Sequence, residues 1–164
     1  MTPKRTGWAW ALATFFGVGF LRPAPGTWGS AAGLLLWLVA AHWLHPTPMH
    51  LALGTAVAAI LLLLAGIPAS TIVSREAATD DPGFVVADEV VGQWIALIAA
   101  SLRPWEWLLA FLLFRVFDIV KPSPARQFDR MHSGFGIMMD DVAAGVYAMV
   151  ILSMVRLFST GWRF

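Results

Sequence analysis

The longest uncharged stretch of this sequence decides what the chain can fold into. The 52 residues between Arg22 and Arg75 contain no Lys, Arg, Asp or Glu. About 20 apolar residues span the hydrocarbon core of a bilayer as a helix, so this stretch suffices for two crossings. A turn signal at 45–48 (His-Pro-Thr-Pro) divides it, because proline favours a break in a helix. We therefore expect two antiparallel membrane helices, Gly29–Leu44 and Met49–Val73.

The remaining apolar segments complete a small bundle. Three of them are predicted as helices: Val90–Leu102, Trp105–Phe117 and Val142–Phe158. A fourth, Gly7–Leu21, is too short to span a bilayer, so we expect a short or re-entrant N-terminal segment. The predicted fold class is all-α, a small polytopic transmembrane helical bundle with that segment at its start. We expect residues 1–164 to form a single integral-membrane domain.

Composition supports this class and excludes others. The chain is 59% hydrophobic and 13% charged, whereas soluble domains are about 45–50% apolar and about 25% charged. It has no cysteine, which excludes thiolate-bound zinc or iron–sulfur centres. Its net charge of +1 indicates no nucleic-acid partner.

The sequence contains three polar regions, at residues 22–30, 74–89 and 118–141. Two apolar segments separate each polar region from the next. They must therefore emerge on the same side of the membrane. The positive-inside rule favours the cytoplasm for that side, because it carries Arg22, Arg75, Lys121, Arg126 and Arg130. Three arginines outside these regions, Arg103, Arg156 and Arg163, count against this orientation.

Two acidic pairs, Asp88-Glu89 and Asp140-Asp141, each stand directly before an apolar segment on that side. Carboxylates at a helix N-terminus are ordinary caps, but one cap needs one carboxylate and neighbouring like charges repel. Four clustered carboxylates suit a hard cation, Mg²⁺ first and Ca²⁺ or Mn²⁺ next. A glycine follows each pair by about one turn, which favours close approach of the two helices.

A second group of charged residues begins near the end of the fifth apolar segment and continues beyond it. Arg115, Asp118 and Lys121 are spaced by three residues and would form a ladder on one helix face. These groups are either salt bridges at the membrane edge, with snorkelling side chains, or a phosphate site. Arginine offers a bidentate fork to phosphate and lysine a point charge. Asp129 and Arg130 add a further acid–base pair.

Two loops carry weaker signals. Gly26 and Gly29 would let the backbone approach a ligand, and Thr27 or Ser30 could cap a helix or donate to an anion. By itself this pattern favours a structural turn. His132 is better explained as a residue of a glycine-rich turn than as a nucleophile.

Five segments occur in this order: Pro25-Gly26-Thr27-Trp28-Gly29-Ser30, Asp88-Glu89-Val90-Val91-Gly92, Phe114-Arg115 with Asp118 and Lys121-Pro122, Phe128-Asp129-Arg130, and Gly136-Ile137-Met138-Met139-Asp140-Asp141. Together they resemble the bacterial phosphatidylglycerophosphatase A family, over residues from about 17 to about 145. Any one of these motifs is weak, but five in sequence with matching spacing are specific.

The resemblance implies an enzyme, a Mg²⁺-dependent phosphatase of the bacterial inner membrane. It would hydrolyse phosphatidylglycerophosphate to phosphatidylglycerol and phosphate in phospholipid biosynthesis. The resemblance also implies an active face toward the cytoplasm, in agreement with the loop parity, and a phospholipid as the substrate. The oligomeric state stays open.

Our hypothesis assigns three roles. The expected ligands of one or two Mg²⁺ ions are Asp88, Glu89, Asp140 and Asp141. The residues expected to bind substrate are Thr27, Arg115, Lys121, Arg126 and Arg130. The expected catalytic residues, which would orient a water or protonate the leaving alkoxide, are Asp118 and Asp129. Direct attack by water is favoured over a covalent aspartyl-phosphate, because the DxDx[TV] motif is missing.

The alternative is a non-enzymatic lipid- or ion-binding membrane protein. The sequence shows no inverted repeat around a mid-membrane site, and its carboxylates lie at one edge. A CDP-alcohol phosphotransferase is the nearest other enzyme, but its long aspartate signature is absent.

Overall fold

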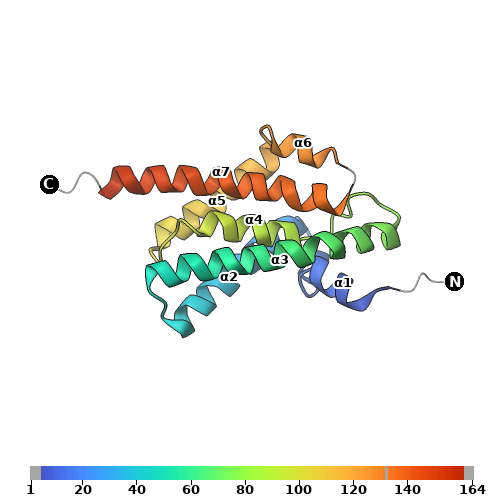
Figure 1. Cartoon of the computed structure of the whole chain (residues 1–164), viewed down its shortest axis with the longest axis horizontal. Helices are drawn as coiled ribbons and strands as arrows, with labels where there is room; N and C mark the ends of the chain where they lie inside the picture. Colours follow the sequence, from blue (N-terminus) through green and yellow to red (C-terminus); the bar gives the residue numbers. More distant parts are fainter. Residues whose placement is uncertain (1–4, 132, 161–164) are drawn as a thin grey trace.

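The computed structural model describes residues 5–131 and 133–160, and this part of the chain is all-helical (Figure 1). The helices in chain order are α1 (Gly7–Ala13), the 3₁₀ helix η1 (Val18–Phe20), α2 (Pro25–Leu44), α3 (Pro48–Ala77), α4 (Ala87–Leu97), α5 (Pro104–Val120), α6 (Ala125–Asp129) and α7 (Gly134–Thr160). The predicted all-α class is confirmed.

Of the described helices, α2, α3 and α7 are long and apolar enough to cross a membrane. Their outward leucines remain open to the surroundings; Leu35 on α2 and Leu64 on α3 are 62% and 63% exposed. In water such a surface would be costly, whereas lipid tails solvate it. The bundle is therefore that of a polytopic membrane protein.

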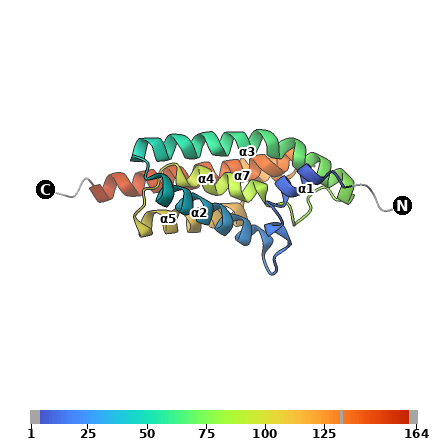
Figure 2. The ribbon, with the colours of Figure 1, turned by 90° about the horizontal axis from the view of Figure 1, so that it is seen from below.

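Helix α4 lies at the centre of the bundle and contacts α2, α3, α5 and α7. Figures 1 and 2 show α3, α4 and α7 running side by side along the long axis. Helix α1, the segment 78–86 and the start of α7 gather at one end, which we call the acidic end. The α2–α3 and α4–α5 connections lie at the other end. The three polar regions thus meet at one end, as the loop parity predicts.

The N-terminal segment does not span the bundle, because α1 has only seven residues. Its start is tied to α3 by the Glu76 carboxylate, which accepts hydrogen bonds from the Thr6 amide at 3.0 Å and from Trp10 Nε1 at 2.7 Å. At its other end the Ala13 carbonyl accepts from the Val86 amide at 2.8 Å. Helix α1 therefore braces the segment that leads into α4.

Helix α7 begins at Gly134, eight residues before the start expected at Val142. The Ser133 hydroxyl accepts a hydrogen bond from the Gly136 amide at 3.2 Å and so caps the first turn. The next apolar residues, Ile137 and Met138, are buried in the hydrophobic core. Asp140 and Asp141 consequently lie in the second turn, and the explanation of this pair as a helix cap is wrong.

Two glycines set the distance between α4 and α7. A Cβ atom added to Gly145 would lie 2.4 Å from the Gly92 carbonyl oxygen, and one added to Gly92 would lie 2.6 Å from the Asp141 carbonyl oxygen. Neither distance is compatible with a side chain. The close approach expected from the glycines is confirmed, and it brings the two acidic pairs to the same level.

Candidate active site

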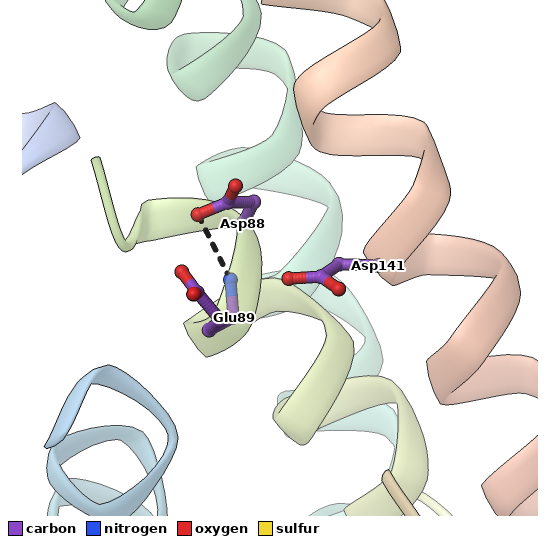
Figure 3. A group of neighbouring side chains, drawn as sticks. All are labelled: Asp88, Glu89 and Asp141. Carbon is purple, nitrogen blue, oxygen red and sulfur yellow. Dashed lines mark hydrogen bonds between the residues drawn. The ribbon is translucent and has the colours of Figure 1, made fainter. Parts of the chain in front are cut away.

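Three carboxylates from two helices meet at the acidic end. Asp88 and Glu89 lie in the first turn of α4, and Asp141 reaches them from α7 (Figure 3). Each offers one carboxylate oxygen, and these oxygens lie within 4.8 Å of one another. The backbone amide of Glu89 donates to Asp88 Oδ1 at 3.1 Å, which fixes one side of the group.

Two members of this carboxylate triad, Asp88 and Asp141, are buried. Asp88 is 8% exposed and Asp141 3%. Glu89 Oε2 and Asp141 Oδ1 are buried without a hydrogen-bond partner among the described residues. Buried carboxylates so close to one another repel strongly unless a cation or protons compensate them. An all-oxygen donor set with unused acceptor atoms fits a hard divalent cation, so the triad could hold a metal ion.

Asp140, the fourth predicted ligand, is not part of the triad. Its Oδ2 accepts a hydrogen bond from Lys121 Nζ at 2.6 Å, and the same ammonium group pairs with Asp129. Burial alone lowers the pKa of Lys121, but the hydrogen bonds to Asp129 and Asp140 outweigh burial and raise this pKa above its ordinary value. Lys121 is therefore a permanent positive charge beside the triad.

The expected ladder along α5 is only half correct. Arg115 Nη1 and Asp118 Oδ2 form the predicted ion pair at 2.7 Å. Lys121 instead follows the last residue of α5, in a left-handed conformation with φ of 47°. The helix ends before this residue, so its side chain pairs with Asp129 and Asp140 rather than with Asp118.

A polar cavity of about 120 Å³ opens onto the triad. Among its lining residues are seven predicted site residues: Asp88, Glu89, Asp118, Lys121, Asp129, Asp140 and Asp141. Asp80 and Asp81 also line it, although the sequence hypothesis gave them no role. Burial raises the pKa of Asp81, and the charge of Lys121 acts in the opposite direction. The only sequence signal for Asp80 and Asp81 is that they form an acidic pair in the polar region before α4.

The other predicted site residues are not among those that line this cavity. Thr27 is exposed in the first turn of α2, and Arg126 and Arg130 are exposed on and just after α6. The neighbouring Gly26 touches the triad directly, since a Cβ atom there would lie 2.1 Å from Glu89 Oε1 and 3.3 Å from Arg115 Nη1. His132 lies outside the described residues.

The arrangement combines a possible cation site, an ammonium group and further carboxylates in one polar cavity at the end of a membrane bundle. Positive charge beside a bound metal stabilises the transferring phosphoryl group, and a carboxylate can orient a water or move a proton. The site therefore has the chemical groups that phosphoryl transfer needs.

Comparisons with known proteins agree with this chemistry. Residues 11–156 match the family described as phosphatidylglycerophosphatase A. The chain is 40% identical over 150 residues to a protein of Haemophilus influenzae named phosphatidylglycerophosphatase A, covering 88% of this chain and 86% of that relative. It is 37% identical over 147 residues to the Escherichia coli K12 protein of the same name, covering 86% and 79% of the two chains.

A third relative carries a different name. A Bacteroides thetaiotaomicron protein named "Putative phosphatidylinositol-3-phosphatase" is 40% identical over 148 residues, covering 88% of this chain and 91% of its own length. No solved structure shows significant similarity to the chain. The family match extends over most of the sequence and confirms the resemblance drawn from the five motifs. The chain therefore belongs to the phosphatidylglycerophosphatase A family of membrane lipid phosphatases.

Proposed function

We propose that this protein hydrolyses the terminal phosphomonoester of phosphatidylglycerophosphate, giving phosphatidylglycerol and inorganic phosphate. The observation that carries the proposal is the buried triad of Asp88, Glu89 and Asp141, which shares one cavity with Lys121 in a chain of this family. The relatives from H. influenzae and E. coli support the choice of substrate through their names.

We assign Mg²⁺ to the carboxylate triad. Its oxygen-only donors and two unused buried acceptor atoms suit a hard cation better than a soft one. When bound, such an ion polarises phosphoryl oxygens and lowers the pKa of a water. Asp140 would support the site from outside, through its hydrogen bond to Lys121.

The remaining groups act on substrate and water. Lys121 lines the cavity, and its ammonium group is assigned to bind a phosphate oxygen there. Asp118 lines the same cavity and is the carboxylate assigned to orient the attacking water or to protonate the leaving alkoxide, with Asp129 as the second candidate. The exposed cations Arg126 and Arg130, with Thr27, are assigned to the lipid headgroup.

The orientation in the membrane follows from the same proposal. The acidic end would face the cytoplasm of a bacterial inner membrane, with α2, α3 and α7 crossing the bilayer. The positive-inside rule supports this side. The polar regions at the acidic end carry five cationic residues: Arg22, Arg75, Lys121, Arg126 and Arg130. The phosphate group would then meet the triad at the membrane edge while the acyl chains stay in lipid.

Replacement of Lys121 by methionine should lower kcat by about 100-fold, because a preorganised charge on the phosphoryl group is lost. Methionine keeps the length of the side chain, so folding should change little. Phosphate release from micellar substrate measures the effect. Arg103→Met at the opposite end, where Arg103 is 59% exposed, is the matched loss of one cation and should leave kcat unchanged. Equal rates for the two variants would remove Lys121 from the mechanism.

Arg115→Lys should lower kcat/KM by about tenfold, although the charge is kept. Arg115 Nη1 contacts both Asp118 and Ser30. The planar guanidinium group holds this nitrogen in a defined position, whereas a lysine ammonium group on its flexible stem is not held in this way. Steady-state kinetics of the purified variant measure the change. An unaltered kcat/KM would reduce Arg115 to a salt bridge without catalytic consequence.

The choice of substrate is tested by comparing the rates at which three lipid phosphates are hydrolysed. Purified protein should release phosphate from phosphatidylglycerophosphate at least tenfold faster than from phosphatidylinositol 3-phosphate or phosphatidic acid. The name of the B. thetaiotaomicron relative makes phosphatidylinositol 3-phosphate the specific second candidate. Faster release from that lipid would assign it as the substrate, and no release from any of the three by folded protein would favour the non-enzymatic alternative.

A further inference from the structure

Ser30 in α2 has an unusual environment for a helical serine. It is 0% exposed, and its hydroxyl donates a hydrogen bond to the Gly26 carbonyl oxygen at 2.9 Å. The same Oγ accepts a hydrogen bond from Arg115 Nη1 on α5 at 3.3 Å. This hydroxyl is buried, and it both donates and accepts a hydrogen bond within the protein. It therefore has no role as a helix cap or as a donor to an external anion.

The arginine that Ser30 holds is itself bound to a cavity residue. Arg115 Nη1 contacts Asp118 Oδ2 at 2.7 Å, and Asp118 lines the polar cavity. Arg115 Nε is buried and has no hydrogen-bond partner among the described residues. Among the described residues, the orientation of the guanidinium group therefore depends on the two contacts of Nη1, with Ser30 and with Asp118.

Helical serines often have a purely structural role. Serine in a helix commonly donates to the carbonyl four residues earlier, and Ser153 in α7 does so with the Met149 carbonyl at 2.8 Å. Ser30 differs in two respects, since it is completely buried and accepts a hydrogen bond from a charged side chain. Hydrogen bonds to charged groups are the stronger ones.

We propose that Ser30 is a positioning residue that acts through Arg115 to hold the Asp118 carboxylate in its place at the cavity. The proposal rests on the proposed function, in which Asp118 orients water or moves a proton. Gly26 joins the two parts of the site, because its carbonyl binds Ser30 while its Cα packs against Glu89. Without the hydroxyl, the Arg115 guanidinium group can rotate about its remaining contact with Asp118. This rotation would displace the Asp118 carboxylate from its position at the cavity.

The test is Ser30→Ala in the full-length protein, compared with Ser153→Ala as a serine that lacks the arginine contact. We expect kcat to fall by about tenfold for Ser30→Ala, KM to stay within about twofold, and Ser153→Ala to match the wild type. The Mn²⁺ affinity of Ser30→Ala, measured by electron paramagnetic resonance, should equal that of the wild type. Merely structural damage between α2 and α4 would weaken Mn²⁺ binding at Glu89 as well.

Two further variants separate hydrogen bonding from packing. Ser30→Cys fills the same space with a weaker donor and acceptor, so it should also lose activity. In an Arg115→Lys background, Ser30→Ala should lower kcat by less than about a further twofold, because Ser30 acts through Arg115. Wild-type kcat in folded Ser30→Ala, or full additivity in the double variant, would overturn the proposal while the proposed function stands. A wild-type protein that hydrolyses none of the lipid phosphates would overturn both.

Discussion

Asp141→Asn should abolish phosphate release from phosphatidylglycerophosphate while the protein remains folded in the membrane. Asparagine has nearly the same volume as aspartate, so the packing of α7 against α4 is kept. The negative charge is lost at the most buried member of the triad, which is 3% exposed and has a carboxylate oxygen without a partner among the described residues. We expect kcat/KM to fall by about three orders of magnitude, as electrostatic stabilisation of the phosphoryl group is lost.

The measurement is phosphate release by purified variants at saturating Mg²⁺. Asp88→Asn should behave as Asp141→Asn does, because both carboxylates belong to the same triad. Glu76→Gln is the control, since this α3 carboxylate binds Thr6 and Trp10 rather than lining the cavity. Full activity of either asparagine variant would refute the assignment of the metal site.

Gly92→Ala should be nearly as damaging, although it changes no chemical group of the site. Its methyl group would lie 2.3 Å from a ring carbon of Phe114 and 2.6 Å from the Asp141 carbonyl oxygen. Backbone cannot yield as a flexible side chain can, so α7 must move away from α4 and take Asp141 with it. We expect loss of activity by about 100-fold or more and destabilisation by about 1–3 kcal/mol from overpacking.

Gly54→Ala provides the matched control in α3, because nothing lies within 4 Å of a Cβ atom added there. Glycine to alanine in a helix stabilises by about 0.5–1 kcal/mol when space is free, so this variant should melt at the wild-type temperature or above. Thermal unfolding in detergent and phosphate release measure both effects. Gly92→Ala with wild-type activity and melting temperature would show that α4 and α7 do not need their close contact.

Much of the fold follows from the sequence because its determinants are local. The uncharged stretch between Arg22 and Arg75 and the turn signal at 45–48 define α2 and α3, although Pro68 lies inside α3 without ending it. The alternation of polar and apolar regions requires the polar regions to meet at one end. Glycines near both acidic pairs correctly indicated the contact of α4 with α7.

What the sequence could not show are contacts between distant segments. The early start of α7 depends on the burial of Ile137 and Met138 against other helices, which no local pattern reveals. The partners of Lys121 are likewise set by the end of α5 and the path of the chain through α6. For Ser30 the sequence left two local roles open, and its actual partner lies 85 residues away on α5.

The most direct test of the metal-dependent phosphatase is a Mg²⁺ titration of phosphate release from phosphatidylglycerophosphate by the purified protein. Release should be absent with excess chelator, rise with added Mg²⁺ to saturation, and be lost in Asp141→Asn at every Mg²⁺ concentration. Release that continues unchanged in chelator, or no release from demonstrably folded protein at any Mg²⁺ concentration, would contradict the proposed role of the triad.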